Sequence, residues 1–318
     1  METIIETKDL KKYFEIDKNR VVHATDGLSV TISENEIVGL VGESGSGKST
    51  FGKAVVGLHD KTSGEVWYKG ELTPQRFTPS DYKKYSTEMQ MIFQDPYSSL
   101  NPRMTVLEII GEGLHLQGGI SNADIKERVA EWLRRVGLQP DHMSRYCHEF
   151  SGGQRQRIGI ARALVLEPKF VVCDEPISAL DVSVQAQVVN LLGEFRDTLG
   201  ISLLFIAHDL SMVRYVSDRI VVMYLGALVE VGKADEVFFH PRHPYTRLLI
   251  GSNPEADPEY ERKHEHVPIK GEIPSPINIP PGCRFAGRCP DVMEDCHKIT
   301  PKVVMKNESH GAACLLYA

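Results

Sequence analysis

The nine residues Gly42-Glu43-Ser44-Gly45-Ser46-Gly47-Lys48-Ser49-Thr50 match the pattern G-x-x-x-x-G-K-[ST] of a phosphate-binding loop. An apolar run, Ile37–Val41, precedes them and a helix-permissive run, Thr50–Val56, follows. The glycines let successive backbone N–H groups surround an anion, and the helix N-terminus adds its dipole. We expect Lys48 to contact the β- and γ-phosphate oxygens and the Ser49 hydroxyl to ligate Mg²⁺. A glycine-rich turn that carries a lysine by chance is the alternative, and the strand–loop–helix context disfavours it.

Composition and charge limit the classes of protein to be considered. The 318 residues allow one large domain and a smaller one, and 42% hydrophobic residues suffice for a core. The formal charge of −7 argues against a general nucleic-acid binder, which needs a basic surface. The longest apolar runs, Ser202–Ala207 and Ile220–Val229, are shorter than the ~18 residues of a membrane span. No export signal is visible at the N-terminus, so we expect a cytosolic chain whose cysteines are thiols or metal ligands.

Two carboxylates follow a second apolar run. The segment Phe170-Val171-Val172-Cys173-Asp174-Glu175-Pro176 is typical of a buried parallel strand, at whose C-terminal edge ligands bind in open α/β sheets. Asp174 can hold Mg²⁺ through water, and Glu175 can polarise an attacking water. An Asp-Glu pair after a strand is usually a turn, but the phosphate loop upstream favours the Mg²⁺ strand.

A second glycine-rich segment precedes a predicted helix. Phe150-Ser151-Gly152-Gly153-Gln154 leads into the helical run Ile158–Leu166. Two glycines and a serine at a helix start make another anion-binding N-terminus. A single nucleotide uses one loop, so two such sites in one chain need an explanation.

Two further polar positions follow in the chain. Ser178-Ala179-Leu180-Asp181 opens a predicted helix, Gln185–Leu199, and the strand Ser202–Ala207 ends at His208. A histidine at a strand end is often only a hydrogen-bonded turn residue. In this series of sites we favour a contact between His208 and the γ-phosphate.

The segments around the phosphate loop read mainly as strands. Residues 3–41 predict two or three strands, the first ending with Leu10–Phe14. Tyr13 in that strand can stack on a base, or it can be an ordinary strand aromatic packed in a core. Short strands are predicted over residues 57–93, and Gln94 follows them as a polar residue at a strand end, which suggests a hinge.

Residues 100–165 read as helical. Ser121 or Asn122 caps one helix there, and Gly137 ends it. Its apolar face, which we expect to be ordinary core, consists of Ile125, Val129, Trp132, Leu133 and Val136.

The C-terminal part is rich in proline and cysteine. Seven of the 18 prolines lie between Ser252 and Gly282, which indicates a linker or an extended wrapping segment. His264 and His266 in that segment are read as solvated, with metal binding as the alternative. Four of the six cysteines, Cys283, Cys289, Cys296 and Cys314, fall in the last 36 residues.

Four cysteines in a cytosolic tail suit Zn²⁺ or a [4Fe–4S] cluster, and free thiols or adventitious disulfides remain the third alternative. Structural zinc sites usually include a C-x₂₋₄-C pair, which these spacings lack. A cluster tolerates longer gaps, and Cys289 precedes a proline as the last cysteine of bacterial ferredoxin runs does. We favour the cluster, in a structural role, with Arg284 and Arg288 offsetting its negative charge.

In their order and spacing these motifs resemble the ATPase subunit of an ABC transporter. The resemblance covers residues 3 to about 240 and rests on Gly42–Thr50, Gln94, Ser151–Gln154, Val171–Glu175, Ser178–Asp181 and His208. It departs at Phe150, where the family's signature has a leucine. The dipeptide/oligopeptide importer ATPases are more similar still, above all the second of their two ATPase subunits. That closer resemblance rests on Phe93–Arg103, His243–Thr246 and Pro276–Cys296.

The resemblance implies an α/β fold: a P-loop ABC ATPase core with a mixed sheet, an antiparallel β-subdomain and a helical subdomain at about residues 95–165. The ATPase domain would span residues 1–250, and a small cysteine-containing extension residues 251–318. Two subunits would pack head to tail, so that ATP at Gly42–Ser49 of one is closed over by Ser151–Gln154 of the other. This arrangement explains the second glycine-rich site.

Site roles are implied in the same way. Tyr13 resembles the adenine-stacking aromatic, and Gln94 the residue that links Mg²⁺ and the γ-phosphate to the permease. Asp181 resembles the cross-interface aspartate, Glu175 the general base and His208 the γ-phosphate sensor. Importer ATPases with similar tails carry a [4Fe–4S] cluster.

The implied function is to drive import of dipeptides or oligopeptides by hydrolysing ATP at the cytoplasmic face of the membrane. Expected partners are the permease, a sister ATPase subunit or a second copy, and indirectly an external peptide-binding protein, with no nucleic acid. The alternative is a non-transport ABC ATPase acting on DNA or ribosomes, which usually has a coiled-coil insert or two cassettes. A GTPase is less favoured, because Asn-Lys-x-Asp is absent.

Overall fold

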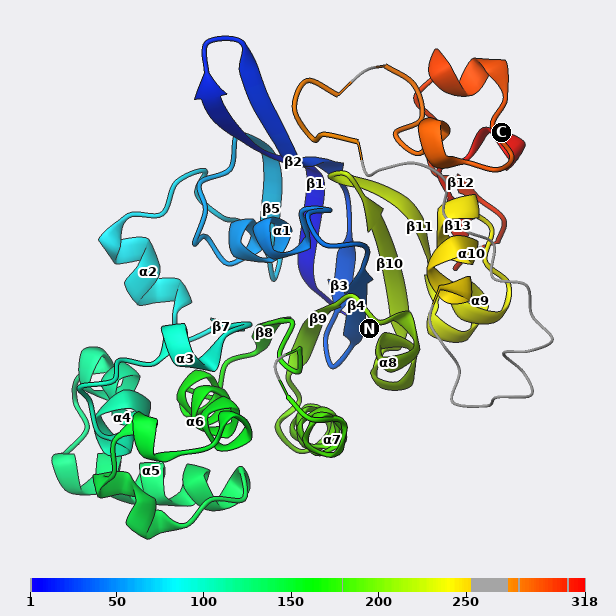
Figure 1. The fold of residues 1–318 in the computed structure, drawn as a ribbon. Coiled ribbons are helices and arrows are strands. Elements are labelled where there is room, and N and C mark those ends of the chain that lie inside the picture. The colour runs from blue at the N-terminus through cyan, green and yellow to red at the C-terminus, as the bar shows by residue number, and fades with distance from the viewer. Residues whose placement is uncertain (1, 179, 253–273, 280, 308, 318) are drawn as a thin grey trace, which may run out of the picture. The chain divides into compact units, whose positions relative to one another are not determined.

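The computed structural model describes residues 2–178, 180–252, 274–279, 281–307 and 309–317. They form two compact units, and Figure 1 shows their elements. The first unit consists of Phe77–Leu204 with two short N-terminal pieces, and the second of Thr3–Ile32, Ile37–Arg76 and Phe205–Ala318. Strand β9, Ser202–Ala207, contains the boundary between them.

An antiparallel sheet in the second unit confirms the expected β-subdomain. Its strands have the order β2-β1-β5-β6, and β3 also pairs with β1. The prediction that the first strand ends at Phe14 is wrong, because pairing with β2 continues as far as Asp17 opposite Arg20. Residues 3–41 accordingly hold four strands and not two or three. The bounds are β1 Thr3–Asp17, β2 Arg20–Leu28, β3 Thr31–Ser33, β4 Ile37–Val41, β5 Ser63–Tyr68 and β6 Glu71–Leu72.

Strand β4 belongs to a mixed sheet, whose part in the second unit runs β12-β13-β11-β10-β4. β4 and β10 are parallel, and the remaining pairs are antiparallel. All five residues of β4 are buried, which is why its sequence is uninterrupted apolar. Helix α8 packs closely on β4, since a Cβ at Gly39 would lie 2.1 Å from Val213. The strands are β10 Arg219–Tyr224, β11 Ala227–Lys233, β12 Val304–Met305 and β13 Gly311–Ala312; the helices are α1 Lys48–Val55, α8 Leu210–Val216, α9 Ala234–Phe239 and α10 Pro244–Gly251.

The first unit is mainly helical, with parallel strands β7 and β8. Ser121 caps α5, whose predicted apolar face is buried, and Gly137 follows its end with a φ of 74°. Two helices begin earlier in the chain than the sequence predicts. Helix α6 begins at Gly152, because Ser151 supplies a cap there, and α7 begins at Val182. The bounds are α2 Pro79–Tyr85, β7 Met89–Ile92, α3 Pro96–Ser99, α4 Val106–Gln117, α5 Asn122–Arg135, α6 Gly152–Leu164, β8 Phe170–Asp174 and α7 Val182–Leu199.

The described part of the proline-rich segment lies along β2. The backbone N–H of His23 donates to the Pro276 carbonyl at 3.0 Å, and Asn278 Nδ2 donates to the Asn19 carbonyl at 2.8 Å. These bonds support the wrapping interpretation for residues 274–279. His264 and His266 lie outside the described residues. Short 3-10 helices follow in the extension at Ala286–Arg288, Glu294–His297 and Leu315–Tyr317.

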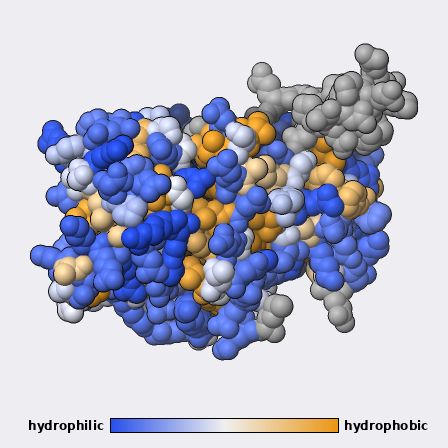
Figure 2. Space-filling model, turned by 90° about the horizontal axis from the view of Figure 1, so that it is seen from below, coloured by the Kyte–Doolittle hydropathy of each residue, from blue (hydrophilic) through white to orange (hydrophobic). Residues whose placement is uncertain are grey.

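Figure 2 shows a mainly hydrophilic face on which hydrophobic residues gather in patches. Within the part of the chain that the structure describes, no helix combines the length and the apolar character needed to cross a membrane.

Candidate functional site

The phosphate loop joins β4 to α1 in the second unit, as the sequence predicts. Lys48 Nζ lies within the loop and donates to the carbonyls of Gly42, at 2.7 Å, and Glu43, at 3.0 Å. Gly47 is the N-cap of α1 with a φ of 97°, and a Cβ there would lie 1.8 Å from the Ala24 carbonyl oxygen. Only glycine fits that position, so the loop shape is imposed by backbone sterics.

Glu43 is held from the C-terminal part of the chain. Its backbone N–H donates to the Tyr245 hydroxyl at 2.8 Å. Its carboxylate accepts two bonds from the Arg288 guanidinium, at 2.7 and 2.9 Å. This bidentate pair raises the pKa of Arg288. Sequence reasoning assigned Arg288 to the cysteine site, and the structure instead pairs it with the phosphate loop.

Tyr13 lies in β1 with a defined set of partners. Its hydroxyl donates to Asp26, and its ring lies 4.2 Å from the His23 ring, tilted by 31°. Burial and then the bond to Asp26 raise the pKa of Tyr13. Asp26 also accepts from Arg284, which is the second arginine that sequence reasoning had placed at the cysteine site. A partly exposed aromatic is therefore fixed in orientation.

The first unit brings Gln94 and Glu175 together. Gln94 Nε2 donates to Glu175 Oε2 at 2.7 Å, although 81 positions separate the two residues in the chain. Asp174, the last residue of β8, is buried. Glu175 has a φ of 43°, a backbone conformation that costs a non-glycine residue about 1–3 kcal/mol and that clusters at functional sites.

Ser151 begins α6 with a capping box. Its Oγ accepts from the Gln154 N–H at 3.4 Å, and Gln154 Oε1 accepts from the Ser151 N–H at 3.0 Å. Arg155, which sequence reasoning did not single out, donates to the carbonyls of Phe150 and His148 and lies 4.0 Å from the Tyr97 ring centroid. The glycine-rich start of α6 is thus held by the capping box and by the bonds of Arg155.

The remaining predicted residues lie at element ends. Asp181 is the exposed N-cap residue of α7. His208 is exposed directly after β9, and Asp209 next to it caps α8. By unit, the phosphate loop, Tyr13 and His208 belong to the second, and Gln94, Asp174, Glu175, Ser151–Gln154 and Asp181 to the first.

The four tail cysteines are close enough to influence one another. The Cys283 N–H donates to the Cys296 carbonyl at 2.7 Å. Burial raises the pKa of Cys283, Cys289 and Cys314, to about 11 for Cys289, and neighbouring tail thiols raise each of them further. All are free thiols. Among the residues described, no three or more His, Cys, Asp or Glu side chains form a group that could hold a metal ion.

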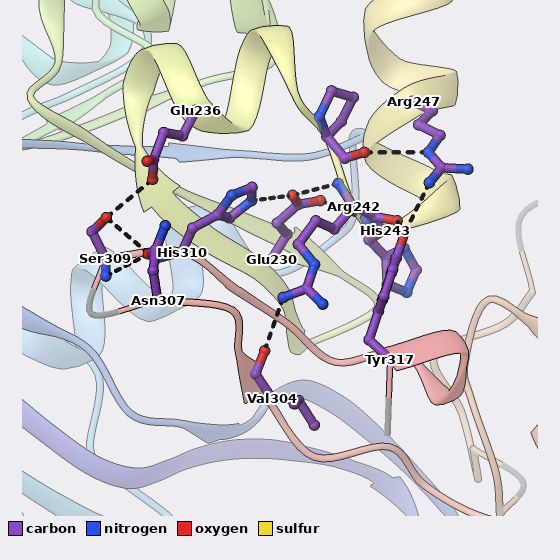
Figure 3. A network of polar contacts seen from close by, with 11 residues as sticks. Glu230, Glu236, Arg242, His243, Arg247, Val304, Asn307, Ser309, His310 and Tyr317 are labelled. Atoms are coloured by element: carbon purple, nitrogen blue, oxygen red, sulfur yellow. Dashed lines mark hydrogen bonds and ion pairs between the residues drawn. The ribbon is translucent and has the colours of Figure 1, made fainter.

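A buried polar network ties the extension to β11 (Figure 3). Glu230 is fully buried and accepts from the backbone N–H groups of Arg242, at 2.7 Å, and His243, at 2.8 Å. His310, also buried, lies 2.7 Å from the same carboxylate through Nε2. Burial lowers the pKa of His243 to about 4. The network joins the end of the chain to the core.

Known protein families and known proteins are similar to this chain along most of its length. The family model of the ABC transporter matches residues 25–178, and that of the oligopeptide/dipeptide transporter C-terminal region matches residues 229–296. The putative oligopeptide transport ATP-binding protein YkfD of Bacillus subtilis (strain 168) is 50% identical over 99% of this chain and 95% of its own. The oligopeptide transport ATP-binding protein OppF of Escherichia coli (strain K12) is 48% identical over 98% and 96%.

Solved structures are similar in fold. The ATP-binding cassette MJ0796, a dimer in a post-hydrolysis state bound to ADP and Pi, has a TM-score of 0.67 and 27% identity, covering 73% of this chain and 99% of that one. The cbiO1 protein of Clostridium perfringens, part of an ABC transporter complex, has the same TM-score and identity over 76% and 92%. The chain therefore belongs to the ABC transporter ATP-binding proteins, in the oligopeptide/dipeptide transporter branch that carries the additional C-terminal region.

Proposed function

We propose that the chain is the ATP-hydrolysing subunit that powers import of dipeptides or oligopeptides through a membrane ABC transporter. The observation that carries this proposal is the phosphate loop, with Lys48 held between the carbonyls of Gly42 and Glu43. The proposal is also supported by relatives that match the chain along almost its whole length, and by the match of the transporter C-terminal region.

The loop residues and the acidic strand have complementary roles. Lys48 and the loop N–H groups bind the β- and γ-phosphates of ATP. Ser49 and Asp174 hold Mg²⁺, together with Gln94. Glu175 polarises the attacking water, and the Gln94 amide orients its carboxylate.

A second group of residues completes the site. Tyr13 stacks on adenine, and His208 contacts the γ-phosphate. Ser151–Gln154 and Asp181 act on ATP bound by a partner ATPase, in a head-to-tail dimer with a sister subunit or a second copy. ATP binding closes the dimer and hydrolysis reopens it, and the two states drive the permease because each interacts differently with nucleotide. The permease holds the chain at the cytoplasmic face of the membrane.

Reconstitution tests this proposal. The chain is co-expressed with the permease and the sister ATPase that the proposal expects, and peptide uptake and phosphate release are measured in proteoliposomes. Lys48→Ala should abolish both, because it removes the loop's side-chain cation, whereas Lys8→Ala, an exposed lysine of β1, should abolish neither. ATPase activity that responds to DNA or ribosomes, and not to peptide and permease, would instead support the alternative class.

A [4Fe–4S] cluster on the tail is a separate proposal. Four thiols from a short segment suit this group, and Cys283 lies close enough to Cys296 and Cys314 for both of them to raise its pKa. When bound, the group supplies four metal–thiolate bonds, and metal binding of this kind contributes folding free energy. Its role here would be to pin an extension with little apolar content.

Metal analysis tests the cluster. Protein purified without oxygen is assayed for iron, sulfide and zinc, and its visible spectrum is recorded. Cys289→Ser should lose iron and sulfide, and Cys147→Ser, a buried cysteine outside the tail, should keep them. About one zinc and no sulfide per chain would assign the site to Zn²⁺.

A further inference from the structure

We infer that the segment Cys283–Cys289 of the C-terminal extension is a positioning element for nucleotide, acting through its two arginines. Arg288 holds the phosphate loop, and Arg284 holds the tyrosine of β1. The inference rests on the proposed binding of ATP at Gly42–Ser49. It assigns the extension a part in nucleotide affinity, in addition to any metal that the cysteines bind.

The contact between Arg288 and Glu43 is bidentate and largely buried. The guanidinium makes two bonds to the carboxylate, and its side chain is 5% exposed while that of Glu43 is 19% exposed. Arg288 Nη1 also donates to the Tyr224 hydroxyl at 3.2 Å. The Arg288–Glu43 ion pair is bidentate and largely desolvated. In this geometry an arginine fixes the orientation of a carboxylate most strongly.

An aromatic cluster fixes the segment against the loop. The Phe285 ring lies 5.2 Å from the Tyr224 ring, edge to face, and 5.4 Å from the Tyr245 ring. All three rings are almost fully buried, and Tyr245 is the residue that accepts from the Glu43 N–H. The extension therefore holds Glu43 by its side chain, and α10 holds it by its backbone.

Glu43 matters to nucleotide for two reasons. Its carbonyl accepts a hydrogen bond from Lys48 Nζ, so a shift of Glu43 moves the lysine that meets the phosphates. Its carboxylate is a negative charge in a loop that must accept a polyanion, and a nearby like charge disfavours binding unless it is neutralised. Arg288 supplies that neutralisation.

Arg284 acts at the other end of the segment. It donates to Asp26 and to the Leu225 carbonyl, and Asp26 accepts in turn from the Tyr13 hydroxyl. The Arg284 and Asp26 side chains are 12% and 19% exposed. Arg284 thus fixes the position of Tyr13. Its charge is paired with Asp26, which is not a residue of the phosphate loop.

Replacing the two arginines should change nucleotide affinity in different ways. Arg288→Gln exposes the nucleotide to an unpaired Glu43 carboxylate, so the Kd should rise about tenfold for MgATP, which is equivalent to ~1.4 kcal/mol. The increase should be smaller for MgADP, which carries less charge, and should shrink in high salt. Arg284→Gln releases Tyr13 and should raise the Kd for MgATP and the Kd for MgADP by the same factor.

Binding of fluorescent nucleotide analogues to the full chain measures these effects, alongside KM, kcat and thermal unfolding. Glu43→Gln in the Arg288→Gln background should restore MgATP binding to within about threefold of wild type, because the two effects share one contact. Arg288→Lys should be intermediate, since it keeps the charge and loses the fork. Arg247→Gln is the control: that arginine donates to the Tyr317 hydroxyl and the Pro241 carbonyl and pairs with Asp291, and none of these three residues belongs to the phosphate loop or to the surroundings of Tyr13.

Three outcomes would overturn the inference. One is an Arg288→Gln variant with wild-type Kd for MgATP. Another is a loss of affinity that Glu43→Gln does not restore, and the third is an equal loss in Arg247→Gln. Failure of the proposed function is distinguished by Lys48→Ala: if that variant binds nucleotide normally, the loop is not the site.

Discussion

Replacing Glu175 by glutamine separates its role in hydrolysis from its role in the fold. The change removes the charge but keeps a side chain of the same shape. Gln94 Nε2 donates to one carboxylate oxygen at 2.7 Å, and the new amide oxygen can accept the same bond. The positive φ of 43° is as costly for glutamine as for glutamate. The free energy of unfolding should therefore change by no more than about 0.5 kcal/mol.

The rate of hydrolysis should fall much further. A positioned general base contributes about 10²–10⁴-fold in rate, which corresponds to roughly 2.7–5.4 kcal/mol of activation free energy at ~1.36 kcal/mol per factor of ten. The groups that bind phosphates and Mg²⁺ are unchanged, so ATP should remain bound and trap the closed dimer. We therefore expect slow phosphate release together with retained ATP.

The assay is phosphate release under saturating MgATP, with bound nucleotide quantified after rapid gel filtration. Glu167→Gln is a matched control: Glu167 also has a positive φ, of 52°, and lies in the same unit, where it pairs with the partly exposed Arg128. That variant should hydrolyse ATP at the wild-type rate. Near-normal turnover by Glu175→Gln, or an equal loss in Glu167→Gln, would refute the assignment of Glu175 as the base.

Three further predictions concern the loop, the helix cap and the tail. Gly47→Ala should lower the free energy of unfolding by about 3 kcal/mol or more, because both the positive φ and a nearby backbone oxygen exclude a Cβ. Gly45→Ala, which has open space around it, should lower it by only ~1–2 kcal/mol. Urea titration measures both changes. Ser151→Ala and Ser121→Ala should each lose about 1 kcal/mol of cap stability, but only Ser151→Ala should weaken ATP-driven dimerisation by light scattering, with monomer binding spared. In metal-free protein the pKa of Cys289 is raised from an ordinary 9.0 to about 11. At pH 8 the Cys289 thiolate should therefore be roughly a hundredfold scarcer than that of an ordinary thiol. Alkylation of Cys289, followed by mass spectrometry, should be slower than alkylation of a model thiol by the same factor.

Local features could be predicted from the sequence because their signals are contiguous. The phosphate loop, the buried strands β8 and β9, and the cap of α5 at Ser121 all lie where their residue patterns indicate. Each depends on backbone sterics, burial or capping within a few positions. The errors fell on boundaries: β1 extends past Phe14 because its partner β2 decides its length, and α6 begins earlier because Ser151 caps it.

Contacts between distant residues could not be predicted. Arg284 and Arg288 stand beside Cys283 and Cys289 in the sequence, so their charge suggested a role at the cysteine site. The structure pairs Arg288 with Glu43, 245 positions away. An ion pair of this kind leaves no periodic trace in the chain.

The sequence by itself determined the family, the phosphate loop and the candidate catalytic residues, since each is a short motif with its own local chemistry. Only the tertiary structure decided what holds Glu43, what orients Glu175 and how the extension joins β11 through Glu230 and His310. The physical reason is that a buried charge must be paired wherever the fold brings a partner, and the fold sets that distance irrespective of position in the chain.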